Sequence, residues 1–195
     1  ALSELEQLVA MLRQRLAWTE RGTELAPGRL RLAFLPSALP PLLVPVEQAL
    51  AGRTVQAAVP PPVRRGARAF SELVSLTDDP LVNARPGSRP IDDEGVVSSP
   101  LTLVKAGVVE GLIYDLETAS RVGAQPTGHG RRTTFGKPQP AYSNLILEAG
   151  QASWEEILLA VGDGLVLERL WRTGRSNAVG GTFAGPATLA WRVLG

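Results

Sequence analysis

The sequence predicts an α+β fold in which most of the sheet is antiparallel. Three patterns lead to this prediction: an amphipathic helix early in the chain, a β-hairpin near its middle, and helices that follow hairpins without the strand–helix–strand rhythm of a parallel sheet. Of the 195 residues, 44% are hydrophobic and 20% are charged, which is typical of a globular chain rather than a disordered one. No apolar run approaches the ~18–20 residues that a membrane-spanning helix needs, so no membrane segment is expected.

Elements are predicted in the following order. A leucine stripe predicts a helix over 2–20, and Ser3 with Glu6 fits a capping box at its start. Residues 31–35 alternate like a short strand, and the prolines that follow it are expected to break the chain before a short helix ending near Gly52. We therefore expect a helix and linker over 1–27, then one domain over 28–195.

The middle of the chain contains the clearest local unit. After a Pro/Arg/Gly loop, Ala69 to Thr77 is predicted to be a strand closed by Asp78-Asp79-Pro80, and residues 83–100 are rich in turn formers. Two apolar runs, 101–104 and 108–114, then flank Lys105-Ala106-Gly107, which predicts a β-hairpin with a three-residue loop.

Capping signals organise the last third. Asp115 and Gly123 are the expected ends of a short helix, and Ser153 with Glu156 predicts a second one reaching about Ala160. Between them lies a long Gly/Pro-rich loop followed by a strand; two late strands then flank a Gly/Asn-rich turn. Their ranges are 124–142, 143–148, 165–171 and 182–193.

Composition excludes several kinds of chemistry. The chain has no Cys and one His, so disulfides, thiolate ligands and multi-histidine metal sites are absent. Its net charge of +1 gives no overall reason to bind a polyanion. The glycines match neither the dinucleotide-binding fingerprint nor the phosphate-binding loop.

One turn-rich loop concentrates charge in Arg85, Arg89, Asp92, Asp93 and Glu94. Adjacent carboxylates could bind a hard cation such as Mg²⁺ or Ca²⁺. The interpretation we favour is structural: the acids and arginines pair with one another and fix the loop. Calcium-binding loops place their ligands at alternate positions, and this run does not.

A second candidate is His129, which could serve as a general base but is more simply interpreted as an exposed loop histidine. Around it the chain is basic, with no acid between Glu117 and Glu148. This loop could contact single-stranded nucleic acid or an acidic protein surface. The side chains concerned are Arg121, Arg131, Arg132, Phe135, Lys137 and Tyr142.

A family resemblance covers roughly residues 28–195. The segments that carry it are Thr77-Asp78-Asp79-Pro80, Gly87 to Val96, the hairpin from Leu103 to Gly111, Thr127 to Arg132 and Ser143 to Gly150. In this order and spacing they resemble the TldD/PmbA family, also known as modulators of DNA gyrase. His129 stands where many relatives have Asn.

The resemblance implies a barrel-like, mostly antiparallel C-terminal domain that is a fragment of a longer protein. It also implies a cytoplasmic metalloprotease made of two kinds of subunit, which processes or degrades small unfolded peptides. The TldD-like subunit carries zinc on a His-Glu-x-x-x-His helix with a downstream Cys, and the PmbA- or TldE-like subunit lacks these ligands.

Aligning the helix that ends at Gly52 on the zinc helix places Leu43, Val44 and Gln48 at the His, Glu and His positions, with Val74 at the Cys position. Leu and Val have no lone pairs, and Pro45 is expected to distort the helix. The resemblance therefore implies a non-catalytic subunit without zinc, which pairs with a TldD-like catalytic subunit or with itself as a dimer.

Partner or peptide contacts are expected in two loops, 85–95 and 124–142. The candidate residues are Arg85, Arg89, Asp92, Asp93, Glu94, His129, Arg131, Arg132 and Asn144. Two alternatives remain open: a standalone hydrolase that uses His129 with a carboxylate of 92–94, and a module that binds gyrase, another protein or nucleic acid. Because the net charge is only +1, nucleic acid is the partner we least expect.

Overall fold

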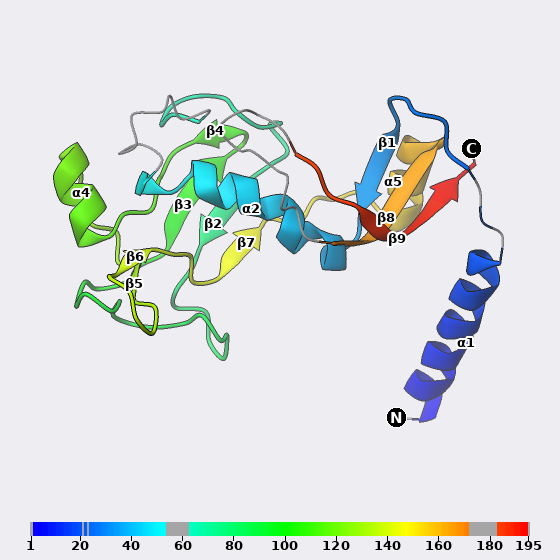
Figure 1. The fold of residues 1–195 in the computed structure, drawn as a ribbon, viewed down its shortest axis with the longest axis horizontal. Helices are drawn as coiled ribbons and strands as arrows, with labels where there is room; N and C mark the ends of the chain where they lie inside the picture. Colours follow the sequence, from blue (N-terminus) through cyan, green and yellow to red (C-terminus); the bar gives the residue numbers. More distant parts are fainter. Residues whose placement is uncertain (1, 21, 23, 54–62, 172–182, 195) are drawn as a thin grey trace.

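A computed structural model describes residues 2–20, 22, 24–53, 63–171 and 183–194. Its elements form two groups on either side of helix α2 (Leu39–Ala49), and helix α1 (Leu2–Thr19) extends away from one of them (Figure 1). The predicted first helix is confirmed, although it begins one residue before Ser3, which therefore lies inside the first turn rather than capping it.

One group is a three-stranded sheet with the order β1-β8-β9. Strand β1 (Arg31–Phe34) runs parallel to β8 (Gly164–Leu170), which pairs antiparallel with β9 (Ala187–Val193). Helix α5 (Trp154–Val161) covers this sheet, and Ala33, Val161 and Val166 form the core between them. The predicted strands 31–35 and 165–171 are confirmed to within one residue, whereas the last strand begins at Ala187, so residues 183–186 of the predicted range 182–193 are not part of it. The predicted Gly/Asn-rich turn and Thr182 lie outside the described residues.

The other group is an antiparallel four-stranded sheet with the order β4-β3-β2-β7. Its core contains Leu50, Leu103 and Ile113, all fully buried. The sheet consists of β4 (Val108–Val109), β3 (Leu101–Lys105), β2 (Leu76–Asp78) and β7 (Leu145–Leu147).

Helix α2 joins the two groups. After the 3-10 turn η1 (Pro36–Ala38), its first half packs in a third small core through Leu42, and its last residues join the core of the four-stranded sheet. The prolines at 40 and 41 do not precede the helix as predicted but lie in its first turn, where backbone N–H groups have no intrahelical partner. The helix also continues through Pro45.

The two predicted capped helices are confirmed. In α4 (Leu116–Val122), Asp115 accepts a hydrogen bond from the backbone N–H of Thr118, and Gly123 ends the helix in the left-handed conformation. In α5, Ser153 and Glu156 form a reciprocal capping box. Each helix is specified by residues within or next to it, which explains why the sequence could predict both.

The predicted strand over Ala69–Thr77 is mostly wrong, because only Leu76 and Thr77 lie in β2. The segment before β2 instead wraps around the hairpin turn. The N–H groups of Ala69 and Phe70 donate to the carbonyl of Gly107, and the N–H of Gly107 donates to the carbonyl of Val74.

Two further predictions about the middle of the chain are corrected. The hairpin loop has two residues, Ala106 and Gly107, both with positive φ, because Lys105 belongs to β3. Residues 124–142 are not a continuous loop, because β5 (Gly130–Arg131) pairs with β6 (Gln139–Pro140).

The α+β class with mostly antiparallel pairing is confirmed, and the described strands form open sheets rather than a closed barrel. Within the described ranges, no helix has the length and apolar character needed to cross a membrane.

Candidate functional site

His129 is fully buried and hydrogen-bonds to Asp78, so the prediction of an exposed loop histidine is wrong. Its Nε2 lies 3.0 Å from Oδ2 of Asp78 at the end of β2. Its Nδ1 lies 2.8 Å from the carbonyl oxygen of Thr127. The ring therefore connects the 127–130 segment to the four-stranded sheet.

Both ring nitrogens have hydrogen-bond partners. A carboxylate can only accept, so Nε2 donates to Asp78. Nδ1 lies 2.8 Å from the carbonyl oxygen and 2.9 Å from the hydroxyl of Thr127, and that hydroxyl also accepts from the backbone N–H of Tyr114.

Asp78 has further partners inside the same site. Both of its carboxylate oxygens accept from the backbone N–H of Ser143, at 2.9 and 3.1 Å. Nearby, Tyr142 donates its hydroxyl to the carbonyl of Glu47 on α2. Burial, followed by repulsion from Glu47 and Asp78, raises the pKa of the Tyr142 phenol, so it stays neutral. Burial and repulsion from Asp78 also raise the pKa of the Glu47 carboxyl.

The three adjacent acids have a structural role, but not the predicted one, because they bind backbone N–H groups instead of arginines. Buried Asp92 accepts from the N–H groups of Glu94, Val96 and Gly130 at 2.8–2.9 Å. Asp93 accepts from the N–H of Arg132, which lies at the start of the loop between β5 and β6.

Glu94 connects a different pair of segments. Its Oε2 accepts from the backbone N–H of Leu116, the first residue of α4. Its carboxylate also packs on Gly130 so closely that a Cβ there would lie 2.4 Å from Oε2. The three acids therefore hold the His129 segment and the start of α4 in place through hydrogen bonds to their backbone N–H groups. It does not pair with His129 as the hydrolase alternative requires.

The other candidate residues divide into anchored and exposed side chains. Asn144 donates to the carbonyl of Asp79 and the hydroxyl of Ser88, which holds the 79–90 loop against β7. Arg89 has its Nε and Nη2 buried without an acceptor among the described residues. Arg85, Arg131 and Arg132 are exposed.

The residues at the four aligned zinc positions do not fit a zinc ion. Leu43, Val44 and Gln48 lie on α2, and Val74 packs beside the core of the four-stranded sheet. Zinc binds thiolate, imidazole or carboxylate donors, and the only polar group in this set is the Gln48 amide. Elsewhere in the described chain, no three side chains of His, Asp or Glu gather as a metal-binding group.

Sequence reasoning missed three members of the buried site: Asp78, Thr127 and Glu47. Asp78 was interpreted as the end of a strand, and the contact that reveals its role joins positions far apart in the sequence. The available signal was indirect, because a single His in a Gly-rich segment needs hydrogen-bond partners if it is buried.

The chain matches the family model of the PmbA/TldA metallopeptidase C-terminal domain over residues 27–195. A TldD homologue from Haemophilus influenzae, described as a metalloprotease, is 35% identical over 51% of this chain and 21% of its own length. A metalloprotease from Methanothermobacter thermautotrophicus is 32% identical over 66% of this chain and 28% of its own length. This chain thus spans between a fifth and three tenths of these relatives.

Two solved structures resemble this fold with a TM-score of 0.76. One is a candidate modulator of a DNA gyrase from Thermotoga maritima, which is 27% identical; the match covers 89% of this chain and 40% of that protein's chain. The other is TldE from Thermococcus kodakarensis, which is 25% identical; the match covers 98% of this chain and 44% of the TldE chain. From the family match over residues 27–195, the chain belongs to the PmbA/TldA metallopeptidase C-terminal domain family.

Proposed function

We propose that this chain is part of a non-catalytic, TldE-like subunit of a two-subunit cytoplasmic metalloprotease that processes or degrades small unfolded peptides. In this proposal the zinc belongs to a TldD-like catalytic partner. This chain pairs with that partner and helps to form the peptide-binding cleft.

One observation carries the proposal: side chains without zinc-binding groups fill the aligned ligand positions. A catalytic zinc site needs three protein ligands and a water. Leu43, Val44 and Val74 offer none, so a single reverse substitution would not recreate the site. The likeness to a TldE structure over 98% of the chain supports the same interpretation.

The four-stranded sheet suggests how a peptide would be held. Strand β7 is its outer strand and, within the described residues, pairs only with β2. Its free edge could add an extended peptide through main-chain hydrogen bonds, which tolerate many side chains. The exposed Ile146 and Leu147 would supply apolar contacts along this edge.

Zinc binding tests the alignment directly. We expect no stoichiometric zinc in the purified chain by elemental analysis and calorimetry. The matched variant is Leu43→His/Val44→Glu/Gln48→His/Val74→Cys, which restores the aligned donors and should gain one zinc per chain. One tightly bound zinc in the unaltered chain would overturn the proposal.

Partner binding tests the assembly. The full-length protein is expected to co-purify with the TldD-like chain of the same organism and to increase its peptidase activity. A stable protein with no affinity for that chain would contradict the proposal, because a subunit without ligands has no catalytic role alone.

A further inference from the structure

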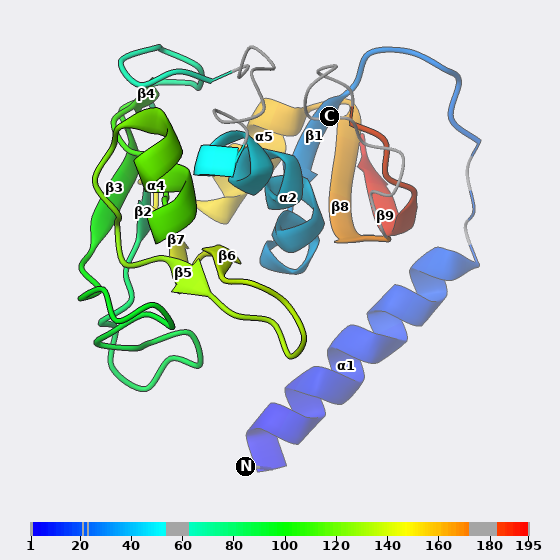
Figure 2. The same ribbon diagram turned by 60° about the vertical axis from the view of Figure 1, so that its left-hand side comes forward.

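The loop between β5 and β6, residues 131–138, presents an aromatic side chain entirely to solvent. Phe135 is 101% exposed, the highest value among the large apolar side chains in the described chain. The loop projects beyond the strands that carry it (Figure 2). Leaving a whole Phe ring in water forfeits about 1.5–3 kcal/mol of burial free energy, so this side chain is suited to contact another molecule.

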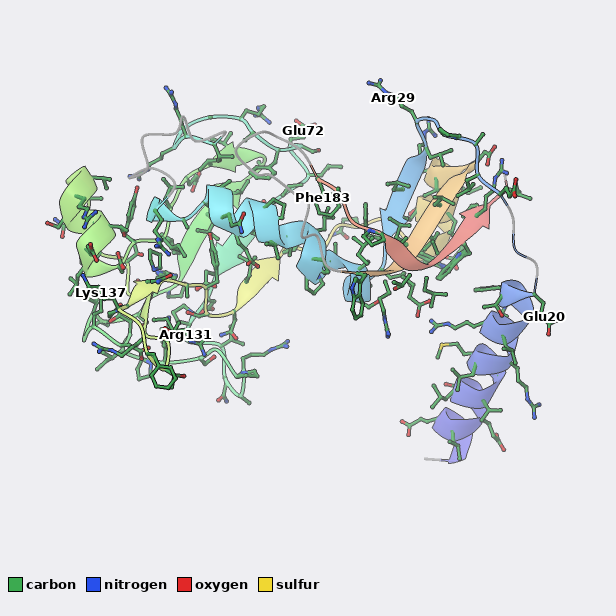
Figure 3. All side chains as sticks on the ribbon, in the orientation of Figure 1. Glu20, Arg29, Glu72, Arg131, Lys137 and Phe183 are labelled. Carbon is green, nitrogen blue, oxygen red and sulfur yellow. The ribbon has the colours of Figure 1, made fainter. Side chains whose placement is uncertain are left out.

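Three cationic residues without ion-pair partners in the described chain flank Phe135 in the sequence. Arg131, Arg132 and Lys137 belong to the same loop, and Figure 3 shows the labelled Arg131 and Lys137 at one end of the molecule. None of the three forms an ion pair with a described carboxylate. The segments 54–62 and 172–182, which the structure leaves out, contain no Asp or Glu.

The base of the loop is held by several hydrogen bonds. Asp93 binds the N–H of Arg132, Asp92 binds the N–H of Gly130, and the N–H of Ala141 donates to the carbonyl of His129. His129 in turn is fixed by Asp78. A loop ordered at both ends loses less conformational entropy when it binds, which favours affinity.

A cavity of about 410 Å³ adjoins this loop, between α4 and β6. Its lining includes the cations Arg53, Arg121 and Lys137. Of its two acids, Asp115 caps α4 and Glu117 pairs with Arg121, so Arg53 and Lys137 are the cations that have no acidic partner in the lining. The cavity therefore suits a carboxylate from outside the chain.

We propose that the 131–138 loop is a docking element that inserts Phe135 into an apolar pocket of a protein partner whose rim carries carboxylates. One such carboxylate would enter the cavity beside Lys137. Resting on the function proposed above, the inference assigns this partner as the TldD-like catalytic chain. Aromatic side chains flanked by Arg are typical anchors of protein interfaces.

Other classes of partner fit the loop less well. Single-stranded nucleic acid binds grooves in which several aromatic rings stack on successive bases. The other aromatic residue of this region, Tyr142, packs against the core and donates its hydroxyl to Glu47. A membrane surface would require a broader apolar face than one ring.

The test is calorimetric titration of the full-length protein with the TldD-like chain at physiological salt. Phe135→Ala should weaken binding by at least about tenfold. The matched control is Leu73→Ala, which removes another highly exposed apolar side chain from a different loop. It should leave binding unchanged. Arg131→Gln/Lys137→Gln should slow association and reduce its dependence on salt.

The outcomes separate the two proposals. If the unaltered protein binds its partner and Phe135→Ala binds equally well, the docking inference is wrong while the proposed function stands. If the unaltered protein does not bind at all, the proposed function fails and the docking inference fails with it. The inference would also be overturned if Phe135→Ala lost binding to a DNA oligonucleotide or to anionic vesicles but kept its binding to the TldD-like chain.

Discussion

Asp78 and His129 can both be buried because each is a hydrogen-bond partner of the other. Both side chains are completely inaccessible to water, and the His129 ring has no other carboxylate among its hydrogen-bond partners. Removing one partner of a buried hydrogen bond leaves the other without its partner in a site that water does not reach. The pair therefore makes the 127–130 segment dependent on the strand that ends at Asp78.

Asp78→Asn is expected to lower the free energy of unfolding by about 1–3 kcal/mol, because one of the two buried oxygens that accept from His129 and Ser143 becomes an amide nitrogen, which cannot accept. Denaturation by urea would measure this change. The double variant Asp78→Asn/His129→Asn replaces both partners and should be no less stable than the single variant. If the two single effects simply add, the side chains do not interact as described.

Glu47 gives the chain a stability that depends on pH. Because its pKa is raised above 4.5, the folded state binds this proton more tightly than the unfolded chain does. The resulting stabilisation is complete below pH 4.5 and is lost as the pH rises through the raised pKa of the folded state.

Glu47→Gln keeps the shape of the side chain without its titration. The variant should therefore be more stable than the unaltered chain at neutral pH, and this difference in stability should vanish below pH 4.5. Urea denaturation over a pH series would measure the difference between the two proteins. A difference that stays constant with pH would contradict the assignment.

At the scale of elements, the hairpin turn between β3 and β4 contains a residue unsuited to its conformation. Ala106 has φ +44° and Gly107 has φ +81°, the pattern of a two-residue turn that favours Asn-Gly. For residues with a Cβ, the left-handed region costs roughly 1–2 kcal/mol, and Asn tolerates it better than Ala does.

Ala106→Asn should therefore raise the free energy of unfolding by up to about 1 kcal/mol. Gly107→Ala is the opposing variant, since its Cβ would lie 2.5 Å from the carbonyl oxygen of Phe70. It should destabilise the chain. Thermal denaturation of both variants would check the sign of each effect, and a destabilising Ala106→Asn would exclude the turn geometry.

Sequence signals predicted the elements whose determinants are local. Asp115 and Ser153 mark helix starts with side chains that bind N–H groups three residues away. The strand over Ala69–Thr77 failed because its hydrogen bonds go to Gly107, and periodicity carries no information about such a partner. His129 was misplaced for the same reason, since its burial depends on Asp78.

At the scale of the whole molecule, α2 is shared between separate cores. Leu42 packs with Leu167 and Leu170, whereas Ala49 and Leu50, the residue that follows the helix, belong with Leu103 and Ile113. A helix that contributes to both cores should make their unfolding cooperative. The sequence could not predict this coupling, because the hydrophobic pattern of α2 does not say what each residue contacts.

Tryptophan fluorescence can test the coupling, because Trp18, Trp154, Trp171 and Trp191 all lie in α1 or beside the three-stranded sheet. Leu50→Ala should cost about 2–5 kcal/mol. It should also move the tryptophan transition to lower denaturant, although Leu50 lies in the other core. An unchanged tryptophan transition would show that the two sides unfold independently.

The parallel pairing of β1 with β8 constrains how the chain can be made. Arg31 lies opposite Gly164, so the first strand of this sheet leaves the ribosome long before its neighbour exists. At about 5–20 residues per second, synthesis of the intervening segment takes roughly ten seconds. During that time the four-stranded sheet can already form, since its strands fall between them. Nascent β1 therefore has no strand partner in its sheet until β8 has been made, and its length of only four residues limits its pairing with other chains.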